Sequence, residues 1–183
     1  MFSLLHYIFK AFASHDPHFI QSSMCVVTWI WPNFGLVSLN VDNNMFLESN
    51  LDAFGGLICD CTRSFLHEFL GNISRPCILH AEILGLYHGL KLCWNSDYKH
   101  VLCLSDSRIV VDLVQKGLNM FHKYENFIWT INWYRMLRYW VVNLQHTMRK
   151  GNVAPNFLTK KGAWVTVTML SSMKPLLTCH LYS

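Results

Sequence analysis

Hydrophobic and polar residues alternate in the first half of the chain, a pattern typical of half-buried β-strands. The alternation covers residues 36–42, after which Asn43 and Asn44 favour a turn. Two more strand-like runs, over 54–60 and 64–70, are joined by a short polar connection and predict an antiparallel pair. We therefore expect three consecutive antiparallel strands.

The pattern becomes helical after residue 78. Apolar residues then recur at steps of three and four, which predicts an amphipathic helix; they are Leu79, Ile83, Leu86, Leu90 and Trp94. Further strands and helices follow. We expect a strand over 99–106, helices over 107–115 and 123–138, a strand over 140–145 and a final helix over 152–161.

This order of elements predicts an α/β fold with a five-stranded mixed sheet, in which three antiparallel strands come first, βα units follow and helices flank the sheet. We expect the domain to cover residues 34–163, with an N-terminal extension over 1–33 and a C-terminal tail over 164–183. The uncharged stretch before the first strand is interrupted by polar residues and by Pro32, so we predict no transmembrane segment.

The composition excludes a disordered chain, because 52% of the 183 residues are hydrophobic and only 14% are charged. The charges are unevenly distributed. Residues 1–107 carry five basic and nine acidic side chains, whereas residues 108–183 carry ten basic and two acidic ones. A basic surface attracts a polyanion, and carboxylates that are rare in an apolar chain are candidate metal ligands.

The seven cysteines form no disulfide framework, because their number is odd and most of them lie in apolar runs. Cys59 and Cys61 are separated by one residue and have no matching second pair, which argues against a structural zinc site. We expect a reduced, intracellular protein.

Three acidic residues stand where the expected fold brings them together. Asp42 and Asp106 each end a strand, and Glu82 lies in the first helix beside the core position Ile83. Three carboxylates in one place repel each other unless a divalent cation binds between them, and carboxylate oxygens suit Mg²⁺ or Mn²⁺. Ordinary roles remain open, because Asp106 can start a helix, Asp42 can begin a turn and Glu82 can be a solvated helix residue.

Four short segments, in this order, resemble the type-1 ribonuclease H domain in the form common in plant retroelement-derived proteins. They are Leu-Asn-Val-Asp at 39–42 with the Gly55-Gly56 strand, His-Ala-Glu-Ile-Leu at 80–84 with Gly-Leu-Lys-Leu-Cys-Trp at 89–94, Leu-Ser-Asp-Ser at 104–107, and the closing segment over 146–163. The resemblance implies a ribonuclease H-like five-stranded fold, a site for two Mg²⁺ or Mn²⁺ ions, and endonucleolytic hydrolysis of the RNA strand of RNA–DNA hybrids.

Residue by residue, the resemblance implies that Asp42, Glu82 and Asp106 are metal ligands. His146 matches the family's histidine in a mobile loop, which implies a role in proton transfer or product departure. Asn156 stands at the family's fourth carboxylate position, where its amide offers a neutral oxygen but no negative charge. We therefore expect the second ion to bind more weakly. The loss should be greater for Mg²⁺, which demands near-ideal geometry, than for Mn²⁺.

Asn43 is a second departure from the family pattern, because it replaces the glycine that usually follows the first aspartate. Asparagine tolerates left-handed backbone better than most residues, so we expect a mild effect. Two functions follow from these departures. The first is a metal-dependent hybrid ribonuclease weakened at Asn156, and the second is a catalytically inactive, retroelement-derived nucleic-acid-binding module.

The basic residues after position 108 are the expected phosphate contacts: Arg135, Arg138, Arg149, Lys150, Lys160 and Lys161. A purely solvated role stays open for each of them. Trp129, Trp133 and Trp140 can stack on nucleotides, but their spacing of four and seven residues favours a core stripe. The expected partner is an RNA–DNA hybrid or another nucleic acid, and we expect a monomer.

Overall fold

The computed structural model describes residues 33–46, 51–62, 64–73, 77–117, 123–148 and 169–173. The final helix expected over 152–161 lies outside the described residues. So do five of the predicted site residues: Arg149, Lys150, Asn156, Lys160 and Lys161.

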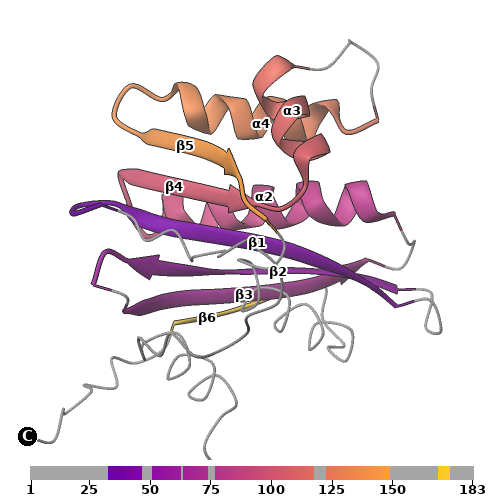
Figure 1. The fold of residues 1–183 in the computed structure, drawn as a ribbon, viewed down its shortest axis with the longest axis horizontal. Helices are drawn as coiled ribbons and strands as arrows, with labels where there is room; N and C mark the ends of the chain where they lie inside the picture. The colour runs from indigo at the N-terminus through magenta and orange to yellow at the C-terminus, as the bar shows by residue number, and fades with distance from the viewer. Residues whose placement is uncertain are drawn as a thin grey trace, which may run out of the picture.

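A mixed sheet with the strand order β5-β4-β1-β2-β3-β6 forms the centre of the described chain (Figure 1). Its strands are β1 (Val37–Phe46), β2 (Leu51–Asp60), β3 (Phe65–Ile73), β4 (His100–Ser105), β5 (Val141–His146) and β6 (Met169–Met173). Strands β1, β2 and β3 are antiparallel neighbours, whereas β4 pairs in parallel with both β1 and β5. The expected three antiparallel strands followed by parallel ones are confirmed.

Strand β1 is longer than expected, and the turn predicted at Asn43 and Asn44 is wrong. Both asparagines continue the ladder, where they pair with Phe54 and Ala53 of β2. Nor does Asn43 adopt a left-handed backbone, since Asp97 is the non-glycine residue of the described chain with positive φ. The hydrogen bonds of the long hairpin therefore override the local turn preference of the two asparagines.

Strand β6 is an element that the hydrophobic pattern did not predict. It comes from the expected C-terminal tail and pairs antiparallel with β3, so that Leu70 lies opposite Leu170. It gives a partner to the backbone groups along the outer side of β3, which would otherwise form an unpaired edge. The described sheet consequently has six strands, and the five expected ones are among them.

The described helices match their predicted positions closely. They are α2 (Ile78–Asn95), α3 (Arg108–Lys116) and α4 (Glu125–Met136). The hydroxyl of Ser107 accepts a hydrogen bond from the Val110 amide at 3.5 Å, and Gly117 ends α3 with φ of 81°. These are the predicted cap and stop signals. Among the described residues, no helix combines the length and apolarity that crossing a membrane requires.

Helix α2 packs closely against β1 because Gly89 has no side chain. A Cβ at this glycine would lie 2.7 Å from Cδ1 of Leu39, which is too close for any real side chain. One hydrophobic core joins this face of the sheet to α2, α3 and α4, and Figure 1 shows α3 and α4 beside the β5 end. Its fully buried residues include Leu39, Ile83 and Ile131.

The predicted core stripe of tryptophans is wrong for two of its three members. Trp129 and Trp133 are 65% and 48% exposed, whereas Trp140 is buried as expected. Helix α4 instead packs inward through Ile128 and Ile131, next to the two exposed tryptophans in sequence. The spacing of four identifies one face of a helix but does not say which face meets the core.

Candidate active site

Asp42 lies inside β1, which continues to Phe46, so the prediction that Asp42 ends its strand is wrong. Strands β4 and β5 do end beside this part of β1. Val41 of β1 pairs with Ser105 of β4, and Ser105 pairs with His146 of β5. Asp42 follows Val41 in the sequence, and Asp106 follows Ser105. Because neighbouring strands lie about 4.8 Å apart, the backbones of these two aspartates are close. This is the juxtaposition that the sequence predicts.

Glu82 reaches the same region from α2. The helix runs antiparallel to β1, and a Cβ at Gly85 would lie 3.7 Å from Cβ of Val41 and 3.8 Å from the carbonyl oxygen of Asp42. Glu82 precedes Gly85 by three residues, which is a little less than one helical turn. The first turns of α2 thus lie over the part of β1 that carries Asp42.

Two of the three carboxylates are buried, and that of Asp106 is partly buried. Asp42 is 1% and Glu82 is 6% exposed, and one carboxylate oxygen on each of Asp42, Glu82 and Asp106 is buried. Burying several carboxylates is costly unless positive charge or hydrogen bonds compensate them. A donor set made of oxygens suits Mg²⁺ or Mn²⁺. Within the described ranges, however, no three Asp, Glu, His or Cys side chains are grouped closely enough to hold an ion.

Two side chains of the β1–β2 hairpin hold the start of α2. The Asn43 amide donates a hydrogen bond to the carbonyl of Ile78 at 3.2 Å, and the Asp52 carboxylate accepts one from the Cys77 backbone N–H. Both hairpin residues are almost completely buried. They fix the helix that carries Glu82, and sequence reasoning missed this role because nothing in the local pattern connects β1 and β2 with residues 77 and 78.

The titration of these groups reflects their surroundings. Burial raises the pKa of Asp52 above its usual value of 3.8, although the hydrogen bond from Cys77 opposes the effect. On the outer side of the helix start, the thiol of Cys77 lies 2.9 Å from the hydroxyl of Tyr124, and this hydrogen bond lowers the pKa of Cys77. The start of α2 is therefore bound both to the hairpin and to the residue that precedes α4.

His146 is the last residue of β5, so it lies in the sheet rather than after it. It is partly buried and pairs with Ser105 of β4, which in turn pairs with Val41 of β1. The ladder continues past it, because the amide of Thr147 donates to the carbonyl of Ser105 at 2.9 Å. The structure thus brings the predicted histidine to the same edge as the predicted carboxylates.

The two described candidates for phosphate contact differ in their surroundings. Arg135 uses Nη1 to donate to the carbonyl of Val114 at 3.3 Å and to Oδ1 of Asn132 at 3.0 Å, which links α4 to α3. Arg138 is exposed in the turn after α4. The position of Arg138 suits a phosphate contact better than that of Arg135, whose guanidinium already has protein partners.

Comparison with solved structures identifies the class of fold. The N-terminal RNase H domain of a Mycobacterium tuberculosis protein superposes with a TM-score of 0.60 at 19% identity, over 69% of this chain and 92% of that one. RNase H1 of Halobacterium salinarum gives 0.61 at 14% identity, over 70% and 97%. An RNase H1 isolated from compost, solved in complex with an RNA/DNA hybrid, gives 0.60 at 19% identity, over 68% and 94%. The protein has a ribonuclease H-like fold.

Sequence comparison shows the family to which the chain belongs. The model of the family described as "Reverse transcriptase-like" matches residues 40–162, so the chain belongs to this family. A candidate ribonuclease H protein of Arabidopsis thaliana is 27% identical over 127 residues, which cover 69% of this chain. The chain spans about one fifth of the length of that relative, since the match covers 20% of it. The resemblance to a ribonuclease H domain of plant retroelement type is confirmed.

Proposed function

We propose that the protein binds RNA–DNA hybrids and hydrolyses their RNA strand with the help of divalent cations. The observation that carries the proposal is that Asp42 in β1 and Asp106, which follows β4, come directly after the paired residues Val41 and Ser105, with the first turns of α2 and Glu82 near them. The carboxyl ends of parallel strands are where α/β proteins commonly place ligand sites. The family and the ribonuclease H-like fold support the same reaction class.

Asp42, Glu82 and Asp106 are the residues that would hold the cations. When bound, such cations supply the positive charge that offsets the charge developing on a phosphodiester during hydrolysis. Because these carboxylates are not yet grouped around one point, their side chains would have to reorient on binding. His146, at the end of β5, would exchange a proton at its imidazole with the attacking water or the leaving oxygen.

A second candidate is a nucleic-acid-binding module without catalysis. It is favoured by Asn156, a neutral residue at the position where the resemblance expects a fourth carboxylate. Three carboxylates balance two divalent cations less well than four do, so the second ion would bind more weakly. Binding of the nucleic acid backbone depends on the basic residues instead and would survive this loss.

Cleavage of a labelled RNA–DNA hybrid separates the two candidates. The full chain is assayed in Mg²⁺ and separately in Mn²⁺, beside the variants Asp106→Asn and Asn156→Asp. We expect cleavage by the unmodified protein, stronger in Mn²⁺ because Mg²⁺ is less tolerant of imperfect geometry. We expect Asp106→Asn to lose cleavage by about 100-fold or more, since it removes several kcal/mol of charge stabilisation, while its melting temperature stays unchanged.

Each outcome of this assay supports a different conclusion about the site. Full activity in Asp106→Asn would refute the proposed site. No cleavage by the unmodified protein, together with cleavage by Asn156→Asp, would mean that the fold is intact and that one side chain has removed the activity. Hybrid binding without cleavage in any variant or metal would establish the binding module.

A further inference from the structure

An apolar stripe lies on the outer face of α4. Its members are Trp129 and Trp133 in the helix, Met136 at its end and Tyr139 in the following turn; we call these four residues the α4 stripe. Met136 and Tyr139 are 83% and 80% exposed. The rings of Trp129 and Trp133 stack on each other, with centroids 5.9 Å apart and planes inclined by 26°. Two stacked indoles exposed on one helix are unusual, because large aromatic residues are normally mostly buried.

The start of α4, about one turn before the first residue of the stripe, lies beside the start of α2. Helix α4 runs in the same direction as α2. Its start is near the start of α2, where His80 stacks on Tyr124 at 5.0 Å, and its end is near the end of α2, where Trp94 contacts Tyr134 at 5.9 Å. Since Glu82 lies in the first turns of α2, the stripe leads away from the carboxylates along the outer side of the helix layer.

Positive charge flanks the stripe. Lys123 is exposed immediately before α4, with its ammonium 4.6 Å from the ring centroid of Tyr124, and Arg138 is exposed immediately after the helix. Glu125 is the acidic residue of α4. The described residues in 108–117 and 123–148 carry five basic and two acidic side chains. This charge favours a polyanion over an apolar protein segment as the occupant.

We propose that the α4 stripe binds a single-stranded nucleic acid extension that continues from the hybrid held at the candidate active site. Exposed aromatic rings flanked by basic residues are the usual means of binding single strands, because every base offers a flat face for stacking and the phosphates meet the cations. A blunt duplex keeps its bases stacked internally and gains nothing from these rings. The inference rests on the proposed function for the position of the duplex.

Binding measured in metal-free buffer tests the inference without cleavage. Two labelled substrates are compared, a blunt RNA–DNA hybrid and the same hybrid with a single-stranded RNA extension. For the unmodified protein we expect tighter binding of the extended hybrid. The double variant Trp129→Ala/Trp133→Ala is expected to bind the extended hybrid more weakly, by a factor of about five to 150 for each base that stacks, and so to lose the preference. Its affinity for the blunt hybrid should stay unchanged.

Two control variants refine the test. Ile109→Ala removes an exposed apolar side chain of α3, outside the stripe, so the preference should persist. Trp129→Phe/Trp133→Phe keeps two rings and should restore most of it. All of these residues are exposed, so circular dichroism should show the same folded content in every variant.

The inference and the proposed function fail separately. Equal affinity of the unmodified protein for blunt and extended hybrids would overturn the inference, even if the blunt hybrid is cleaved. A preference lost in the double alanine variant would support it, even if no cleavage occurs. If the double variant leaves the preference intact but converts a dimer into a monomer in sedimentation, the stripe is a protein interface and the inference is wrong.

Discussion

The two ends of α2 are built from different chemistry, although one helix connects them. At its start, buried polar groups dominate: Asn43 and Asp52 hydrogen-bond to the backbone of residues 78 and 77, and the buried Glu82 lies in the first turns, near Asp42 of β1. At its end, aromatic rings dominate. Trp140 contacts Trp94 at 5.4 Å and Tyr134 at 5.3 Å, in both cases edge to face.

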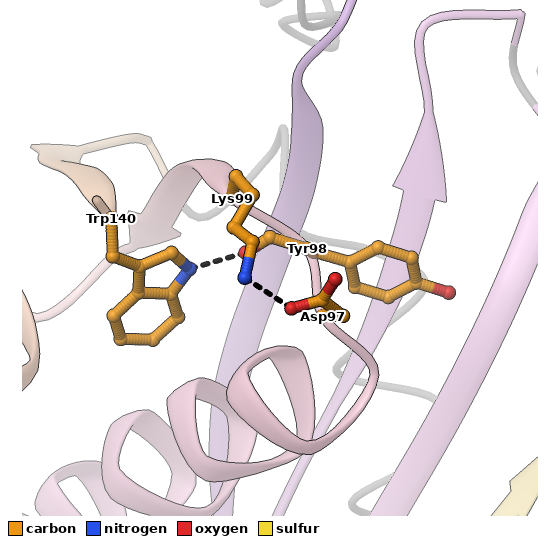
Figure 2. A network of polar contacts seen from close by, with 4 residues as sticks. All are labelled: Asp97, Tyr98, Lys99 and Trp140. Carbon is orange, nitrogen blue, oxygen red and sulfur yellow. Dashed lines mark hydrogen bonds and ion pairs between the residues drawn. The ribbon is translucent and has the colours of Figure 1, made fainter.

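Figure 2 shows the aromatic end from close by. The indole Nε1 of Trp140 donates to the carbonyl of Tyr98, and Lys99 pairs with Asp97. This ion pair is exposed and contributes little to stability. Edge-to-face rings and a satisfied indole N–H are typical of a packed core. Apolar packing therefore fixes the end of α2, whereas at its start buried polar side chains position a carboxylate, that of Glu82.

The largest effect is expected at the aromatic end. Trp140→Ala removes a buried indole and leaves a cavity between α2, α4 and β5, which should lower the free energy of unfolding by about 3–5 kcal/mol. Chemical denaturation measures this change. Trp140→Phe, which keeps a ring, should lose less. An equal loss in both variants would show that the Tyr98 hydrogen bond, rather than packing, stabilises this end.

At the start of α2 we expect a substitution to reduce cleavage without reducing stability. Glu82→Gln keeps the shape of the side chain but removes its charge, so cleavage should fall by about 100-fold or more through the lost cation binding. Its stability should not fall, because a buried charge is removed. Glu125→Gln on the exposed side of α4 is the matched control and should cleave normally. Normal cleavage by Glu82→Gln would contradict the assigned role of this residue.

A smaller effect is expected for the tether between β1 and α2. Asn43→Ala loses the hydrogen bond to the Ile78 carbonyl, which should cost about 0.5–1.5 kcal/mol. Because the start of α2 loosens, the rate constant of cleavage should fall more than the affinity for the hybrid. Single-turnover and binding measurements separate the two quantities. Asn44→Ala, the next residue of the strand, serves as control, and an identical profile there would argue against a specific tether.

The smallest effect is the pH dependence that Asp52 confers. Burial raises its pKa in the folded protein, so between pH 3.8 and the raised value the folded state binds the proton more tightly than the unfolded state. The contribution of Asp52 to stability therefore falls as the pH rises through this window. Asp52→Asn does not titrate, but its amide oxygen can still accept from Cys77.

Denaturation at several pH values between 3.8 and 7 measures this difference. The stability of Asp52→Asn relative to the unmodified protein should improve with rising pH. A difference that is constant with pH, or that shifts in favour of the unmodified protein, would show that Asp52 does not have a raised pKa.

The parts of the site that could be predicted are those that depend on local order. Asp42 and Asp106 can be predicted to lie close together, because alternation and apolar runs locate their two strands. Only Asp106 follows the end of its strand, since β1 continues past Asp42 to Phe46. Glu82 was expected near the sheet because it adjoins the core position Ile83. The tethers Asn43 and Asp52 could not be predicted, because they join residues 35 and 25 positions apart.

The sequence by itself determined the order of elements from β1 to β5, the caps of α3 and the convergence of Asp42, Glu82 and Asp106 on one region of the fold, because periodicity and capping act over a few residues. Only the tertiary structure decided that β1 continues through Asn43, that β6 extends the sheet and that Trp129 and Trp133 face outward. These features depend on which surfaces meet across the fold. The balance between local preference and such distant contacts is settled by burial and by the pairing of backbone hydrogen bonds.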